Sequence, residues 1–295
     1  MTPVAPVERL ASVSDVTAVI PAYQRVDLIG RAVLSALQQF PVRAAEVLVV
    51  DDGSTDGTGD LAERLGARVV RQVNAGEGAA RNTGLRHAST AGVAFLDSDD
   101  AWLPGHLATL VPHLPGRVLV GSVARAVPSG KLVGYPGRHP SVIDPRSVIW
   151  PDSPVLPSAV LVDRAAALAV GGFGDLPRGA DLEFWIRLLQ TGAGLVVPTV
   201  TCTYLEHDGQ VSADTARMRD DRVAVARRFA SAHWFDDGLI QDMAAVIAWD
   251  VYRQAPDRRS AVRALAVGLG TMARRPRSAV ALVEALRWRA AVKWR

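Results

Sequence analysis

The first hundred residues alternate short apolar runs with helical patterns, and this alternation constrains the fold more than any other feature of the chain. Because strands separated by helix-length connections form βαβ units, the order predicts an α/β fold with a mostly parallel central sheet flanked by helices. Ligands bind at the carboxyl ends of such strands. The expected strands are 16–20, 46–50, 67–71 and 93–96; the expected helices are 26–39, from Thr55 or Asp56 to 65, and 77–88.

After about residue 116 the pattern is weaker. Seven prolines between Pro128 and Pro157 predict one long, irregular loop. Beyond about residue 212 the pattern is helical throughout, which predicts a folded part over 1–212 and a C-terminal helical region over 213–295. Further strands are expected at 117–123, 158–162, 195–197 and 201–205, with a helix over 181–190.

Composition narrows the cellular setting and the partners. The single cysteine, Cys202, excludes an internal disulfide and a cysteine-based zinc site, and is typical of a reducing cytoplasm. No secretory signal and no membrane-spanning apolar stretch is expected. Seven basic residues and one acid between Arg274 and Arg295 indicate an anionic partner there. Together with Trp288 and Trp294 they predict either peripheral contact with a membrane surface or a solvated helical cap. The rest of the chain is nearly neutral, which argues against nucleic acid.

Acidic residues follow two of the predicted strands. Asp52 follows the run 47–50, and Asp97-Ser98-Asp99-Asp100 follows 93–96. Carboxylates gathered at one sheet edge repel one another unless a cation joins them, and Mg²⁺ or Mn²⁺ prefers such oxygen ligands and also binds diphosphate. On an extended chain, one of Asp97 and Asp99 could reach the metal and the other a ribose hydroxyl. The alternative is a solvated acidic turn before the next helix; the second acidic strand end favours the metal site.

Glycines precede the third predicted helix in the segment 74–82, and they free backbone N–H groups where an anion can bind. Arg81 lies one turn into that helix and could pair with phosphate. The segment lacks the third glycine of a dinucleotide fingerprint and does not follow the first strand. The chain also has no Gly-x-x-x-x-Gly-Lys-Ser/Thr loop. These absences argue against a dehydrogenase and a P-loop NTPase.

A third acidic segment begins the helix expected at 181–190. Asp181 either caps this helix or faces a cleft, and it does not share a helical face with Glu183. The spacing of Glu183 and Arg187 predicts an ion pair between them. Aromatic residues 184–185 are expected in the core. His207 follows a predicted strand end and is a surface residue unless that strand runs beside the cleft, where it could complete a metal site.

Taken together, these motifs resemble the family 2 glycosyltransferases, which have the GT-A fold. The resemblance is close over 16–114 and looser over 158–212. It implies a nucleotide-binding half at about 14–115 and an acceptor half at about 116–212. The matching segments, in order, are Val19-Ile20-Pro21-Ala22-Tyr23, Val49 to Thr58, Asn74-x-Gly76, Ala80-Arg81-Asn82-x-Gly84-Leu85, Phe95 to Asp100, Gly171-Gly172-Phe173 and Asp181-x-Glu183-Phe184-Trp185-x-Arg187-Leu188.

The resemblance implies transfer of a sugar, with inversion, from a nucleoside-diphosphate donor to a glycan, lipid-linked or small-molecule acceptor. Mn²⁺ or Mg²⁺ would be the cofactor. The family usually has Glu before the catalytic Asp, and this chain has Ala180. The implied roles are base pocket for Pro21, Ala22 and Tyr23, base acceptor for Asp52, diphosphate contact for Arg81, ribose or sugar contact for Asp97, cation ligand for Asp99, general base for Asp181, and metal or phosphate ligand for His207.

Two other classes of protein remain alternatives on the sequence. A nucleotidyltransferase would have a glycine-rich signature directly after the first strand, where this chain has Pro21-Ala22-Tyr23-Gln24-Arg25. A catalytically weak or inactive protein that only binds nucleotide sugars, or acts as a scaffold, could keep the fold without turnover. The departure at Ala180 keeps this second alternative open.

Overall fold

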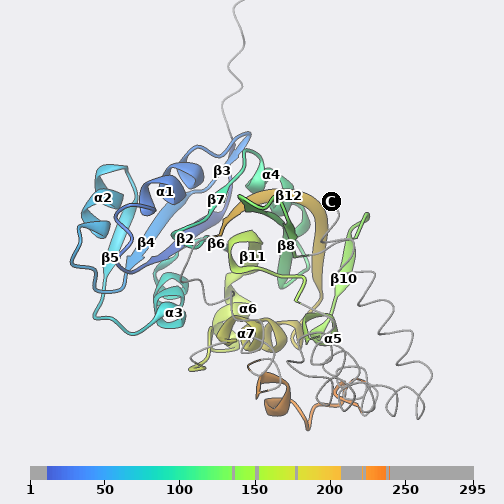
Figure 1. Cartoon of the computed structure of the whole chain (residues 1–295). Helices are drawn as coiled ribbons and strands as arrows, with labels where there is room; N and C mark the ends of the chain where they lie inside the picture. Colours follow the sequence, from blue (N-terminus) through green and yellow to red (C-terminus); the bar gives the residue numbers. More distant parts are fainter. Residues whose placement is uncertain are drawn as a thin grey trace, which may run out of the picture.

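The computed structural model describes residues 12–134, 137–149, 153–176, 179–206, 221, 224–236 and 239. It is a three-layer α/β structure in which helices cover both faces of one large sheet (Figure 1). The sheet has ten strands, and its main path runs β10-β12-β8-β11-β6-β2-β4-β5. A separate small sheet pairs β1 (Ser12–Val13) with β3 (Val42–Arg43).

The first half of the sheet is parallel, as the sequence predicts. Its central strand β2 (Val16–Ala22) lies between β4 (Glu46–Asp51) and β6 (Gly92–Phe95), and β4 also pairs with β5 (Arg68–Arg71). Each of these strands lies within two residues of the predicted bounds. All four end at the same edge of the sheet, so the loops that follow β2, β4 and β6 can together form a site.

The second half of the sheet is mixed. β11 (Val160–Asp163) is antiparallel to both β6 and β8 (Leu119–Val127), whereas β12 (Gly194–Leu205) is parallel to β8. Edge strand β10 (Ser141–Ile143) and the two-residue strand β7 (Ala101–Trp102) pair antiparallel with β12, and β9 (Leu132–Val133) pairs with β8.

Two sequence predictions in this half are wrong. The strands expected at 195–197 and 201–205 are one strand, β12, whose register shifts between Val196 and Val200. Pro198 lies within that shift. Proline has no N–H to donate to the ladder, so inside a sheet it is tolerated at such an irregularity. The stretch 128–157 is not one irregular loop, since it contains β9, β10 and α5 (Pro145–Ile149).

Alternate side chains of the strands support the two helical layers. Ile20 of β2 packs in the core beneath α1 (Ile29–Leu37), α2 (Thr58–Arg64) and α4 (His106–Leu110). Val19 packs on the other face with α3 (Glu77–His87), α5, α6 (Arg164–Ala169) and α7 (Ala180–Leu189). Short 3₁₀ turns occur at η1 (Val111–His113) and η2 (Pro157–Ala159). Phe184 and Trp185 are fully buried, which confirms their prediction as core residues.

Residues 224–228 form part of a helix, and Val225 and Ala226 are buried in the same core as α7. The division of the chain at residue 212 stays a prediction, as does the cytoplasmic location. The basic segment with Trp288 and Trp294 lies outside the described residues. No helix in the described ranges has the length and apolar character needed to cross a membrane.

Candidate functional site

The loops after β2 and β4 are joined to each other at the carboxyl edge of the sheet. The Asp52 N–H donates to the Ala22 carbonyl at 2.8 Å. Pro21 and Ala22 belong to β2 and are buried, whereas the Tyr23 side chain is 47% exposed just beyond the strand end. Of the three residues predicted for a base pocket, Tyr23 therefore exposes its side chain at this edge of the sheet, whereas Pro21 and Ala22 are buried.

Asp52 fixes the loop that leads into α3. The residue is only 3% exposed, and its carboxylate accepts hydrogen bonds from Gln72 Nε2 at 2.7 Å, Ala75 N at 2.9 Å and Gly76 N at 2.8 Å. Three of the roughly four acceptor positions of a carboxylate are thus occupied within the chain. The sequence predicts Asp52 as an acceptor for a base; the structure adds that it holds the 72–76 loop in place.

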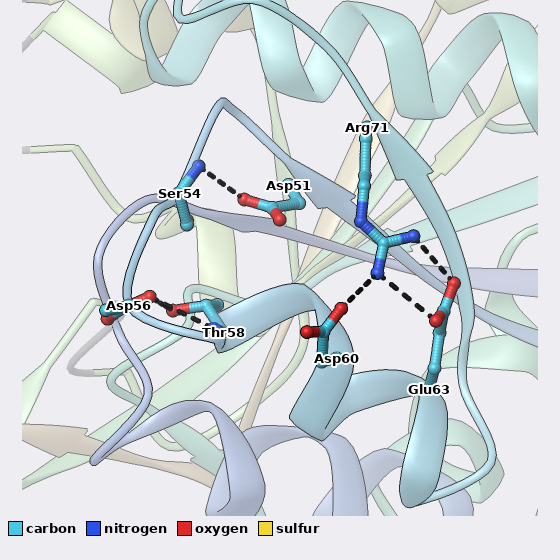
Figure 2. Close-up of polar contacts among 7 residues, drawn as sticks. All are labelled: Asp51, Ser54, Asp56, Thr58, Asp60, Glu63 and Arg71. Atoms are coloured by element: carbon cyan, nitrogen blue, oxygen red, sulfur yellow. Dashed lines mark hydrogen bonds and ion pairs between the residues drawn. The ribbon is translucent and has the colours of Figure 1, made fainter.

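The acidic turn that follows β4 is a rigid structural turn. Asp51 Oδ1 accepts from Ser54 N at 2.9 Å, and Asp56 Oδ1 accepts from both the N–H and the hydroxyl of Thr58 (Figure 2). Gly57 is the N-cap of α2, so the helix begins later than the predicted Thr55 or Asp56. Behind the turn, Arg71 bridges two acids of α2, Asp60 and Glu63 (Figure 2). These acids serve the local structure.

The loop 97–100 after β6 is a turn and not the extended segment expected, because Asp100 N donates to the Asp97 carbonyl at 3.1 Å. Asp100 is buried beneath it and accepts from Ser158 Oγ at 2.5 Å and Leu205 N at 2.9 Å. Ser158 Oγ also accepts from Asp97 N at 3.1 Å. Arg31 of α1 donates to the Asp99 carbonyl at 2.5 Å. Three segments, α1, η2 and β12, therefore hold this loop, and they leave the Asp97 and Asp99 side chains partly exposed.

Negative charge is concentrated in this loop. The pKa of Asp100 is raised to about 7, because burial and the neighbouring charges of Asp97 and Asp99 outweigh the hydrogen bonds from Ser158 and Leu205, which lower it. Repulsion among carboxylates of this kind is relieved by a cation. The loop is therefore suited to a cationic ligand.

Arg81 joins α3 to the acidic loop. Its guanidinium is almost fully buried, and Nη2 donates to Glu77 Oε1 at 2.7 Å and to Asp97 Oδ1 at 2.6 Å. It also lies over the Phe173 ring, 5.3 Å from the centroid. Although burial lowers the pKa of Arg81, the charges of Glu77, Asp97 and Asp181 raise it above its ordinary value. Arg81 is therefore a permanent cation that pairs with the exposed Glu77 and the partly buried Asp97.

Electrostatic contact between Glu77 and its surroundings shows that distant segments converge here. Arg81 lowers the pKa of Glu77, but the charges of three aspartates raise it, and that pKa is raised overall. The three aspartates are Asp97, Asp181 and Asp99. Arg81 of α3, two acids of the loop after β6 and Asp181 of α7 therefore lie within range of one another's charges. That they form one functional site stays a prediction.

Asp181 is not the N-cap of its helix. Gly179, with φ of 71°, holds that position, and no side chain caps the helix end. Asp181 lies in the first turn of α7, where the helix dipole favours its negative charge. The alternative that Asp181 serves as the N-cap is therefore wrong.

The predicted ion pair between Glu183 and Arg187 does not form. Glu183 pairs instead with Arg228, at 3.0 Å. Arg187 donates to the carbonyls of Val170 and, at 2.6 Å, Gly172. Spacing along a helix permits an ion pair, but backbone carbonyls of the loop 170–174 lie within reach of the guanidinium and accept from it.

The loop 170–174 forms hydrogen bonds with both α3 and α7. On the α3 side, Asn82 accepts from Phe173 N at 2.7 Å and donates to the Phe173 carbonyl at 2.8 Å. On the α7 side, Arg187 binds the carbonyls described above. Gly172 has φ of 68°, and a Cβ there would lie 2.1 Å from Asn82 Oδ1, so the contact requires glycine. The two helices that carry Arg81 and Asp181 are thus fixed to one another.

The donor set at the site fits a hard divalent cation that shares its coordination with a ligand. In the described part of the chain, no three His, Cys, Asp or Glu side chains lie close enough together to hold a metal ion by themselves. Mg²⁺ is ordinarily bound through one or two carboxylates together with substrate phosphates and water. Asp99 and Asp97 can supply such carboxylates. His207, the other predicted ligand, lies outside the described residues.

Several residues of the site are not evident from the sequence. Asp100 is visible as a third acid, but its hydroxyl partner Ser158 lies 58 residues later in the chain. Arg31 acts through a backbone carbonyl, and Arg228 follows a segment with no motif. Contacts of this kind depend on the tertiary fold, and no local pattern of residues marks them.

Comparison with known proteins defines the class to which this fold and site belong. The sequence model described as Glycosyl transferase family 2 matches residues 17–150. Glycosyltransferase AglE of Haloferax volcanii is 34% identical over 261 residues, which cover 81% of this chain and 85% of that protein. The chain therefore belongs to the family 2 glycosyltransferases.

The chain is also similar to individual proteins, both in sequence and in solved structure. The pre-mycofactocin glycosyltransferase of Mycobacterium tuberculosis is 33% identical over 218 residues, 69% of this chain but only 45% of that protein. The chain thus matches less than half the length of that relative. S. aureus TarS in complex with UDP-GlcNAc superposes with a TM-score of 0.61 at 18% identity, covering 87% of this chain and 81% of that one. The mannosyltransferase PcManGT from Pyrobaculum calidifontis, in complex with GDP-Man and Mn²⁺, gives 0.60 at 19% identity, with coverages of 94% and 85%. These structures confirm the GT-A fold.

Proposed function

We propose that this protein is a metal-dependent enzyme that transfers a sugar, with inversion, from a nucleoside diphosphate to an acceptor hydroxyl. The observation that carries the proposal is the convergence of Arg81, Asp97, Asp99 and Asp181 from three separate segments. The family, which the chain shares with AglE over most of both lengths, supports the reaction class. The acceptor would be a glycan, a lipid-linked sugar or a small molecule.

The donor would lie across the carboxyl edge of β2, β4 and β6. Tyr23 would flank the base above the loop that Asp52 fixes, and Asp97 would bind ribose or sugar hydroxyls in the orientation that Arg81 imposes. Asp99 would hold Mn²⁺ or Mg²⁺. The bound cation would neutralise the charge that develops on the departing diphosphate. PcManGT, a protein of the same fold, is seen with GDP-Man and Mn²⁺, which supports this arrangement.

On the acceptor side, Asp181 would accept the proton of the attacking hydroxyl. A hydroxyl is a poor nucleophile near neutral pH, and a positioned general base accelerates such a step by roughly 10²- to 10⁴-fold. Asp181 is suited to the task because it occupies the first turn of α7 without serving as a cap. Attack from the side opposite the diphosphate inverts the anomeric configuration.

The first experiment is a thermal-shift panel of UDP-, GDP- and dTDP-sugars with Mn²⁺. A ligand that binds only the folded state raises the melting temperature, so one donor class should stand out. Hydrolysis of that donor, with water in place of the acceptor, then provides an assay, and the sugar first released should have the opposite anomeric configuration by NMR. No stabilisation by any nucleotide sugar, or a released sugar with retained configuration, would contradict the proposal.

Asp181→Asn tests the base in that assay. We expect donor affinity within about threefold of wild type and a loss of at least roughly 10²-fold in kcat, because the amide cannot take the proton. Asp60→Asn is the matched control, since Asp60 is an exposed acid of α2 that pairs with Arg71. If Asp181→Asn hydrolyses the donor as fast as Asp60→Asn, Asp181 is not the base.

A further inference from the structure

The segment 224–236 lies against the beginning of α7. Val225 is fully buried, and Phe229, Trp234 and Phe235 pack against the same core that contains Phe184 and Trp185. A Cβ on Gly179, the N-cap of α7, would lie 3.0 Å from Val225 Cγ2. Hydrogen bonds hold the same segment to α5, because Arg146 donates to the Trp234 carbonyl and to Asp236. The first turn of the helix that bears Asp181 therefore rests on this segment.

Arg228 connects the segment to α7 by charge. Its Nη1 atom lies 3.0 Å from Glu183 Oε1 and 3.4 Å from Asp175 Oδ1, in the loop before the helix. The Glu183 side chain is only 10% exposed, whereas Asp175 is almost fully exposed. Because an unpaired buried charge is costly, Glu183 depends on Arg228 far more than Asp175 does.

The environment of Glu183 gives its carboxylate little freedom. Its Oε2 atom is buried and has no hydrogen-bond partner among the described residues. A Cβ on Gly174 would lie 2.1 Å from the same atom, so the carboxylate lies directly on the backbone of the loop 170–174. Without Arg228, this carboxylate could be solvated only if the first turn of α7 moved away from that loop.

Asp181 and Glu183 share that first turn but face different directions. Residues two apart on an α-helix are separated by roughly 200° around its axis. Asp181 interacts with the charges of Glu77 and Arg81 in the site, whereas Glu183 faces Arg228 on the opposite side. Any rotation that carries Glu183 towards water therefore displaces Asp181 from the site.

We propose that Arg228 is a positioning residue for catalysis. Through its ion pair with Glu183 it holds α7, the helix that bears Asp181, in position. The inference rests on the proposed function, since it requires Asp181 to act as the base. A displacement of about 1 Å in a catalytic group can reduce the rate by roughly 10²-fold. Loss of the ion pair should therefore lower kcat while the donor side of the site, built on β2, β4 and β6, keeps its affinity.

The test measures hydrolysis of the donor identified in the panel by full-length variants. Arg228→Met should lower kcat by roughly 10- to 100-fold and leave the donor KM within about twofold. Arg228→Lys, which keeps the charge, should retain more activity than Arg228→Met. Arg227→Met is the matched control, because Arg227 is the exposed neighbour in the same helix. It should resemble the wild type in both constants.

The double variant Glu183→Gln with Arg228→Met separates positioning from general loss of stability. Neutralising Glu183 removes the unpaired charge, so the double variant should recover at least about fivefold in kcat over Arg228→Met alone. A kcat for Arg228→Met equal to that of Arg227→Met would overturn the inference. So would a loss that only follows the folded fraction in thermal melts, or one that Glu183→Gln does not relieve.

Asp181→Asn, measured alongside, distinguishes the two proposals. If that variant stays active, the proposed base is wrong whatever Arg228→Met does. An inactive Asp181→Asn together with a fully active Arg228→Met would reject the role of Arg228 alone.

Discussion

Asp97, Asp99 and Asp100 are neighbours in the chain, yet their side chains have different surroundings. Asp100 is buried against Ser158 and the Leu205 N–H, whereas Asp97 pairs with Arg81 at the edge of the site. The sequence shows an acidic strand end and predicts its chemistry. It does not show which acid is structural, because Ser158 of η2 and Leu205 of β12 lie far along the chain.

His106 offers a test of packing beneath the site. It is fully buried, stacks on Trp102 at 4.2 Å between ring centroids, and its Nδ1 atom lies 2.8 Å from Thr201 Oγ1. Burial lowers its pKa from 6.5 to about 3. The unfolded chain therefore binds more protons than the folded one between those values, so stability is lost as pH falls below about 6.5.

We expect His106→Leu to remove this acid sensitivity. Between pH 7.5 and 5.5, the free energy of unfolding of the wild type should fall by about 1.4 kcal/mol more than that of the variant. The reason is that about one pH unit of this range lies below the pKa of the histidine in the unfolded chain, and each such unit is equivalent to about 1.4 kcal/mol. Urea unfolding at the two pH values measures the difference. An identical fall in both proteins would show that His106 is protonated in the folded state or accessible to solvent.

At the scale of helices and strands, the sequence predicts the first half of the fold well. The strands β2, β4 and β6 are buried and alternate with helix-length segments, a pattern that is easy to recognise, so they and the edge strand β5 lie close to their expected bounds. In the second half, Pro198 interrupts the pattern of β12, and the prolines of 128–157 conceal β9, β10 and α5. Pairing with β8 and β12, which local sequence does not encode, stabilises these short strands.

The contact of α3 with β2 determines how closely Arg81 approaches the sheet. A Cβ on Gly84 of α3 would lie 2.2 Å from Val19 Cγ1, whereas the nearest atom to a Cβ on Gly30 of α1 would be Leu65 Cδ1, at 3.7 Å. Gly84→Ala should therefore lower the free energy of unfolding by about 1–3 kcal/mol through overpacking.

Gly30→Ala, the same change in a helix with room, should be neutral or stabilise by up to about 1 kcal/mol. Chemical denaturation of both variants gives the comparison. Equal effects of the two substitutions would mean that α3 does not lie as close to β2 as the structure has it.

At the scale of the whole molecule, two halves of the chain contribute residues to the proposed donor and acceptor site. The parallel half supplies Asp52, Arg81 and the loop after β6, and α7 supplies Asp181. Motifs in the sequence identify these residues and predict that they meet. The connections that set their geometry, Asn82 with Phe173 and Arg228 with Glu183, lie 91 and 45 residues apart and emerge only from the folded chain.

The most direct test of the central claim is calorimetric titration of the donor selected in the panel, with and without Mn²⁺. The convergent acids predict that Mn²⁺ tightens donor binding at least about tenfold in the wild type and in the Asp60→Asn control, since carboxylate and phosphate share the cation. Asp99→Ala should bind donor equally weakly under both conditions. Equal affinity with and without Mn²⁺ in the wild type, or an undiminished Mn²⁺ effect in Asp99→Ala, would contradict the account.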